Sequence, residues 1–357
     1  EQEWVFEDIP AVPTPSLFRG FSAPIRLVIE RSREELAFLM AHDSDPFNRW
    51  DAGQELAKRV ILELAGRHAA RGEFSLDDSL VQAFRRVLMD DALDGSIRSL
   101  MMTPPSEPAL AQAMDVVDPD ALHAARRFFL AELGRRLGGE LETVLEATMP
   151  RPGAGVNKDA IDRRRLHNLA LALVTATGEA DALARASAQF DAADNMTDLE
   201  AAFACLVRTP GGAREAAIGK FYERWKSEPL VLDKWFRIQA VSSAPDTFER
   251  VLELAEHPDF SLTNPNRVRA LVGAFALANP VHFHRADGEG YRFLADKVLA
   301  LDGINPQVAS RMVSAFNPWR RFDKARQAKM KGELERIRSK EGLSRDVTEI
   351  VGRALAD

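Results

Sequence analysis

Two arginines stand at matching places in two similar segments, and cations arranged in this way can bind an anion. Residues 264–275 read NPNRVRALVGAF and residues 305–316 read NPQVASRMVSAF, so each segment starts with Asn-Pro and carries an arginine in its second helical turn, Arg269 or Arg311. Helix-pair repeats run about 40 residues, which places the two arginines roughly one repeat apart. If the two arginines lie on the same face of neighbouring repeats, they predict a surface that binds an anionic group.

The same segments also have a purely structural interpretation. Asparagine caps helix N-termini, and proline at the first helical position sacrifices no hydrogen bond, so both Asn-Pro pairs indicate helix starts whatever the function. Carboxylates within the chain could equally satisfy the arginines. Small neighbours at Gly273 and Ala276 favour instead a guanidinium that lies in a groove beside the apolar stripe, partly shielded from water.

Other residues capable of chemistry do not form a convincing set. His282 and His284 alternate near Asp287 and Glu289, which allows zinc in principle, but the segment is a Gly-rich loop and supplies no third imidazole. The sequence contains no H-E-x-x-H, G-x-S-x-G, P-loop or G-x-G-x-x-G motif. We therefore expect no catalytic residue and no metal site on this chain.

Composition argues against two classes of partner. The chain has 357 residues and a net charge of −7, with acidic and basic residues interspersed, so it lacks the basic face that nucleic-acid binding requires. No apolar run approaches the length of a membrane span, so no membrane insertion is expected. The single cysteine, Cys205, lies in the apolar run AAFACLV and is expected to be buried; one cysteine also fits a reducing, cytoplasmic compartment.

Beyond residue 31 the hydrophobic pattern is helical almost throughout. Ser32 and Glu35 form a capping box ahead of the first helix. Further apolar stripes at helical spacing follow over 50–64, 80–88, 122–137, 161–177, 199–206, 213–225 and 248–255. Short joints between amphipathic helices indicate antiparallel neighbours, and many such pairs in series predict an all-α, superhelical, solenoid-like array.

The first 30 residues differ from the rest. Residues 21–30 read FSAPIRLVIE, where apolar and polar side chains alternate, and this period of two predicts a half-buried strand. Two strands cannot form a stable sheet alone. We therefore expect residues 1–30 to be the remnant of a β domain whose other strands lie upstream, or to dock on the helical body. The chain starts with Glu1 and not with Met, which we interpret as a piece cut from a larger protein.

Several blocks of sequence together resemble a known family. In chain order they are PSLFRGFSAPIRL, FNRWDAGQ, DNMTDLEAA, VLDKWFRIQA, the two Asn-Pro segments and, between these, DGEGYRFL. They are similar to the C-terminal portion of bacterial aminopeptidase N, a gluzincin zinc aminopeptidase also called alanyl aminopeptidase, from about Pro13 to the end of the chain. The resemblance implies two parts: the last edge strands of a β-sandwich over residues 1–30, and a helical, ARM/HEAT-like domain over residues 31–357.

The resemblance also implies that catalysis and substrate binding lie on different parts of the full-length protein. The full-length family enzymes remove N-terminal residues from peptides with a zinc ion held by an upstream catalytic domain, which would be this chain's partner. The zinc motif has no counterpart in this sequence, so the chain alone should bind no zinc and be inactive. In the family, the helical domain closes over the active site, restricts access and anchors the peptide. That pattern maps onto Arg269, Gln307 and Arg311, whose proposed role is to attract the carboxylate end of a peptide.

A different class of function stays open at this point. A stand-alone helical-repeat scaffold that binds a protein partner would show the same helical pattern. Such a scaffold would begin with its own Met and a polar capping helix, and the strand-like segment at residues 1–30 argues against it.

Overall fold

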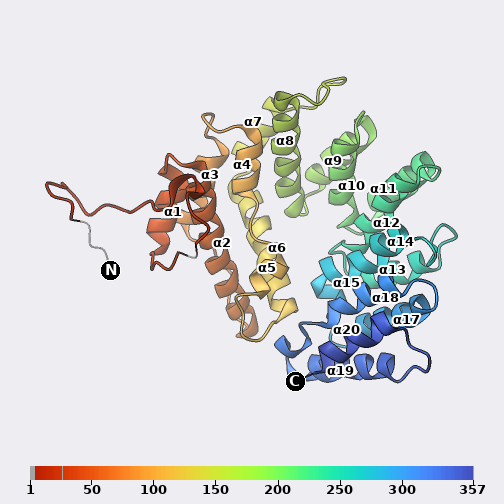
Figure 1. Cartoon of the computed structure of the whole chain (residues 1–357). Helices are drawn as coiled ribbons and strands as arrows, with labels where there is room; N and C mark the ends of the chain where they lie inside the picture. Colours follow the sequence, from red (N-terminus) through yellow and green to blue (C-terminus); the bar gives the residue numbers. More distant parts are fainter. Residues whose placement is uncertain (1–4, 26, 357) are drawn as a thin grey trace.

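The structure, a computed structural model, describes residues 5–25 and 27–356, and these residues form a curved array of helices (Figure 1). The first half comprises α1 (Arg33–His42), α2 (Pro46–Ala69), α3 (Asp78–Leu88), α4 (Gly95–Met102), α5 (Glu107–Ala111), α6 (Pro119–Arg136), α7 (Gly138–Ala147), α8 (Lys158–Ala176), α9 (Ala180–Ala192) and α10 (Met196–Val207). The second half comprises α11 (Gly212–Trp225), α12 (Pro229–Ala240), α13 (Thr247–Ala255), α14 (Pro265–Val268), α15 (Ala274–Ala278), α16 (Pro280–Phe283), α17 (Glu289–Asp302), α18 (Pro306–Val313), α19 (Lys324–Arg338) and α20 (Arg345–Leu355).

The helix starts follow the local sequence signals. The expected capping box at Ser32 and Glu35 is present, with each side chain accepting from the backbone N–H of the other residue. Asn264 caps α14 and Asn305 caps α18, each followed by proline at the first helical position. These side chains accept the N–H groups that the first turn of a helix leaves without partners. Both Asn-Pro pairs are therefore confirmed as helix starts.

The helices pack in two rows along the array. In the first row, α2, α6, α8, α10 and α12 each contact the next, and α12 continues onto the turn before α15. In the second row, α1, α7, α9, α11 and α13 pack on their sequence neighbours in the first row. The buried apolar side chains form one continuous cluster along this length. The predicted all-α superhelical array is thus confirmed. No helix in the described ranges is long and apolar enough to cross a membrane.

The last part of the helical array contacts the α5–α6 region in its first half, which the sequence pattern did not predict. The Arg321 guanidinium donates to the carbonyl oxygens of Ala111 at 2.9 Å and Met114 at 2.6 Å. The N–H of Val117 donates to the Arg321 carbonyl at 2.7 Å. In Figure 1 the C-terminal helices accordingly lie beside the lower end of α5 and α6. The contacts join residues about 200 positions apart, so the curvature of the array brings its last part back to the α5–α6 region.

The strand expected at residues 21–30 does not form in this chain. Within residues 5–25 and 27–30 the structure has no strand, and Arg26 lies outside the described residues. A strand requires a hydrogen-bonded neighbour, and here the side chains instead remain open to solvent, with Val28 87% exposed. The assignment of residues 1–30 to the edge of a β-sandwich therefore remains a prediction.

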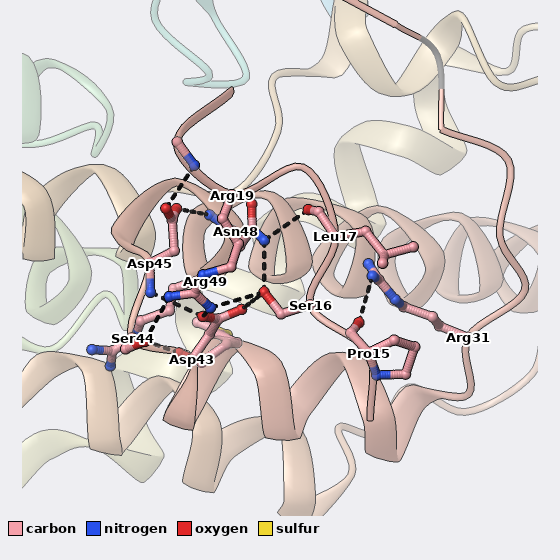
Figure 2. Close-up of polar contacts among 12 residues, drawn as sticks. Pro15, Ser16, Leu17, Arg19, Arg31, Asp43, Ser44, Asp45, Asn48 and Arg49 are labelled. Carbon is pink, nitrogen blue, oxygen red and sulfur yellow. Dashed lines mark hydrogen bonds and ion pairs between the residues drawn. The ribbon is translucent and has the colours of Figure 1, made fainter. Parts of the chain in front are cut away.

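Part of this leading segment is nevertheless fixed to the helical body. The Asp43 carboxylate, between α1 and α2, accepts hydrogen bonds from the Ser16 hydroxyl and from the Arg19 guanidinium at 2.6 Å (Figure 2). The Asn48 amide donates to the Leu17 carbonyl at 2.9 Å. Burial opposes ionisation of Asp43, but these hydrogen bonds outweigh it and hold its pKa below the ordinary value. Residues 16–19 are therefore anchored at the α1–α2 joint.

Candidate functional site

Arg269 opens a turn of unusual geometry. Residues Arg269–Gly273, between α14 and α15, form a π-helical turn in which the N–H of Ala274 reaches back to the Arg269 carbonyl. Such turns are rare and occur frequently at functional sites. The Arg269 side chain is exposed and donates to the Asn266 amide oxygen at 3.0 Å. Within the described residues, no carboxylate lies within 4.0 Å of its guanidinium.

Arg311 and Gln307 lie on the neighbouring helix α18. They are four residues apart, so they share one helix face, and both side chains are exposed. The two arginine-bearing helices meet at Gly273: a methyl group added there would lie 3.9 Å from the Cβ of Arg269 and 3.5 Å from the Cε of Met312. The structure therefore brings these helices into contact one turn after Arg269 and at the residue next to Arg311. As for Arg269, no described carboxylate pairs with Arg311.

A third arginine in the same segment, Arg267, is paired with a carboxylate of this chain. Arg267 is only 4% exposed and donates to Asp233 at 2.7 Å and to the Asp259 carbonyl. Its guanidinium also lies 4.7 Å from the centre of the Phe236 ring. The purely structural interpretation thus applies to Arg267. Arg269 and Arg311 are instead exposed, and the partly shielded groove expected around them remains a prediction.

The loop with the alternating histidines is a packing element. The Nδ1 atom of His284 lies 3.0 Å from the Tyr291 hydroxyl, and the imidazole stacks on Phe322 at 4.1 Å between ring centres. Burial lowers the pKa of His284 to about 3, so the imidazole is neutral in the fold. The structure places no three His, Cys, Asp or Glu side chains, among those it describes, as a metal would require.

Sequence reasoning missed a cavity of about 290 Å³ that three arginines line. Arg126 and Arg127 come from α6, and Arg208 follows the last residue of α10. His123 and Glu107 also line this cavity, with 2.9 Å between the imidazole Nδ1 and the carboxylate. The sequence marks this position by the adjacent arginines in the run HAARRFF, on a helix that carries several other charged residues, so the signal is weak. No sequence pattern connects them with Arg208, because the superhelix alone brings α6 and α10 to one cavity.

Comparisons with known proteins cover nearly the whole chain. A family described as a domain of unknown function, DUF3458_C, with ARM repeats matches residues 33–356. Aminopeptidase N of Caulobacter vibrioides is 41% identical over 358 residues, which cover 98% of this chain and 40% of that protein. Aminopeptidase N of Escherichia coli is 38% identical over 359 residues, which cover 100% of this chain and 41% of that protein.

A solved structure is similar over the same extent. The crystal structure of Legionella pneumophila aminopeptidase A in complex with aspartic acid superposes with a TM-score of 0.87 at 30% sequence identity. The superposition covers 98% of this chain and 41% of that one. This chain therefore spans about two fifths of the length of the proteins that it matches.

Proposed function

Because the chain belongs to the ARM-repeat family DUF3458_C and corresponds to the C-terminal portion of aminopeptidase N, we propose that it is the substrate-enclosing domain of an enzyme that removes N-terminal residues from peptides. Identity of 38–41% over 98–100% of its length to two aminopeptidases N is the observation that carries this proposal. In this proposal the helical array restricts access to an active site on the upstream part of the polypeptide.

The proposed contribution of this chain to binding is electrostatic. Arg269 and Arg311 present exposed guanidinium groups without carboxylate partners in the described chain, from two helices that touch. Gln307 adds an amide one turn before Arg311. A carboxylate is the natural partner of such donors, because a guanidinium can hold both of its oxygens. We therefore propose that these three residues attract and orient the C-terminal carboxylate of a short peptide.

The zinc ion that the family implies does not fit this chain. The described residues provide no set of three metal-ligating side chains, and His284 is already engaged with Tyr291. We propose that the upstream catalytic domain holds the zinc ion, and none of the roles proposed for residues of this chain depends on it.

The same proposal assigns the parts of the chain. Residues 1–30 would be the last edge strands of an upstream β-sandwich and residues 31–357 the helical domain. The anchoring of Ser16 and Arg19 at Asp43 supports a fixed junction between the two. We propose a cytoplasmic location, which agrees with a single, buried and unpaired cysteine.

Hydrolysis of an alanine chromogenic amide, measured together with zinc content, tests the proposed function. The 357-residue chain and the complete polypeptide that contains it are assayed side by side. We expect the complete polypeptide to be active with about one zinc per molecule, as a single catalytic zinc site requires, and the chain to be inert. Turnover by the chain alone would reveal a site on it. Inactivity of both would favour the helical-repeat scaffold.

A further inference from the structure

The arginine-lined cavity lies where the first-row helices end. Its walls come from the start of α5, which includes Glu107, from the middle of α6, from the C-terminal ends of α8 and α10, from the residues that follow α12, and from the joint between α15 and α16. Four successive first-row helices, α6, α8, α10 and α12, thus contribute with their neighbours to one space of about 290 Å³. This volume is at the small end of ligand pockets, which fits one terminal residue of a chain better than a whole peptide.

The cations in this cavity are not paired directly with carboxylates around them. In the described chain no carboxylate lies within 4.0 Å of the guanidinium of Arg126, Arg127 or Arg208. The Nε of Arg126 donates to the Pro105 carbonyl at 2.9 Å, which fixes the base of that guanidinium. Burial lowers the pKa of Arg126; the Glu107 carboxylate opposes this effect from a distance, and the charge of Arg208 adds to it. The two cations therefore lie within electrostatic reach of each other, and an anion between them would relieve their repulsion.

Helix ends offer an alternative reason for arginines at this place. Each helix C-terminus carries roughly half a negative charge and has carbonyls that need donors. At two of these ends other residues already supply the donors. Asn279 donates to the Ala240 and Ser242 carbonyls, both at 2.9 Å, and the Ser242 hydroxyl donates to the Val207 carbonyl at 3.0 Å. Capping at these ends therefore does not account for the arginines.

From this arrangement we propose that the cavity is a second carboxylate-binding site, in which Arg126, Arg127 and Arg208 receive the C-terminal carboxylate of a longer peptide. The identification of the ligand as a peptide rests on the proposed function. Among anions, a carboxylate matches the cavity best, because the site has neutral groups beside the cations for the adjoining peptide bond and side chain. Ser243 and Thr209 provide such polar groups, and Leu130 provides an apolar one.

The spacing along the chain sets the length of the proposed ligand. Arg269 lies before α15, and Ala278, the last residue of α15, lines the cavity. Nine helical residues rise about 13 Å at 1.5 Å each, and an extended peptide spans about 3.3–3.6 Å per residue. A peptide whose carboxylate reaches the cavity should therefore be about four residues longer than one whose carboxylate stops at Arg269.

A titration of this chain with trialanine acid tests the site without relying on catalysis. Arginine guanidinium signals are followed by nuclear magnetic resonance in the 357-residue chain with 13C-labelled arginine, and the signals are assigned by Arg127→Gln, Arg208→Gln, Arg269→Gln and Arg151→Gln. We expect the acid to shift the Arg127 and Arg208 signals saturably, about tenfold more tightly than trialanine amide. Arg151 is exposed on the connector after α7 and serves as the control within the same sample.

The outcomes separate the two proposals. If the Arg208 signal moves no more than the Arg151 signal, the cavity does not bind carboxylate and the inference fails, whatever happens at Arg269. If the acid shifts Arg208 but not Arg269, the cavity site stands and the anchoring role of Arg269 fails. In the complete polypeptide, Arg208→Gln should raise KM about fivefold for an octapeptide acid and leave a tetrapeptide acid unchanged. Equal effects on both peptides would contradict the length assignment.

Discussion

Removing the charges of Arg269 and Arg311 together should weaken the binding of short peptides far more than the binding of an uncharged substrate. The change is Arg269→Gln with Arg311→Gln in the complete polypeptide, which keeps side chains of similar reach and polarity. Both arginines are exposed and have no carboxylate partner in the described chain, so the substitutions break no ion pair among the described residues. A rise in KM that is confined to the acid substrate should therefore come from the lost interaction with its carboxylate.

The size of the effect follows from the exposure of the two groups. A hydrogen bond to a charged group contributes about 1.5–3 kcal/mol when shielded, and exposed ion pairs contribute about 0.2–1 kcal/mol. Since both side chains are exposed, we take about 1 kcal/mol for each, near the upper limit for an exposed pair. Two such losses amount to about 2 kcal/mol, or roughly a 30-fold increase in KM for a tri- or tetrapeptide acid.

Steady-state kinetics on matched substrates measures this effect. A tetrapeptide acid, the same tetrapeptide as its C-terminal amide and an alanine chromogenic amide are compared in the parent enzyme, the double variant and Arg151→Gln. The double variant should lose only the preference for the acid, and Arg151→Gln should behave as the parent enzyme. An equal rise in KM for the acid and for both amides would refute carboxylate anchoring.

Two further predictions concern the stability of the fold. Gly290→Ala should lower the free energy of unfolding by about 1–3 kcal/mol, because a Cβ there would overlap the Phe283 carbonyl. Gly303→Ala is the control: a Cβ at Gly303 would have nothing within 4 Å, so this variant should be nearly neutral in the same urea titration. Equal stabilities of the two variants would contradict the close packing at Gly290. Between pH 8 and pH 5 the free energy of unfolding of the parent chain should fall by about 2 kcal/mol because of His284. The folded imidazole has a pKa of about 3 and stays neutral over this range, whereas the unfolded imidazole takes up a proton below its ordinary pKa of 6.5. This contribution to stability is complete above the unfolded pKa and is lost as the pH falls. His284→Phe should therefore remove this part of the pH dependence. An unchanged pH dependence in the variant would show that His284 is not buried in its neutral form.

Most of the helical fold could be predicted from local sequence signals. Ser32 with Glu35, and the Asn-Pro pairs at Asn264 and Asn305, mark helix starts because the capping partners lie within three residues. The contact between the last part of the array and the α5–α6 region could not be predicted in this way. Arg321 donates to carbonyl groups about 200 residues away. Every residue has a backbone carbonyl, so the identity of the accepting residue does not reveal such a hydrogen bond.

The candidate site could be predicted only in part. Arg269, Gln307 and Arg311 follow from repeated segments and from resemblance, and the structure brings their helices together. Their exposure was not foreseen, because small neighbours such as Gly273 predict room around a side chain but not what covers it. The cavity around Arg208 was missed altogether, since residues from α6, α10 and α15 meet there only through the curvature of the array.

A structure of the complete polypeptide with a bound, non-hydrolysable tetrapeptide acid would test carboxylate anchoring by this domain without any kinetic assumption. We predict that the peptide carboxylate lies within hydrogen-bonding distance, about 2.7–3.2 Å, of the guanidinium of Arg269 or Arg311. A carboxylate that instead points to solvent or to the upstream domain, with both guanidinium groups unoccupied, would contradict the proposed anchoring.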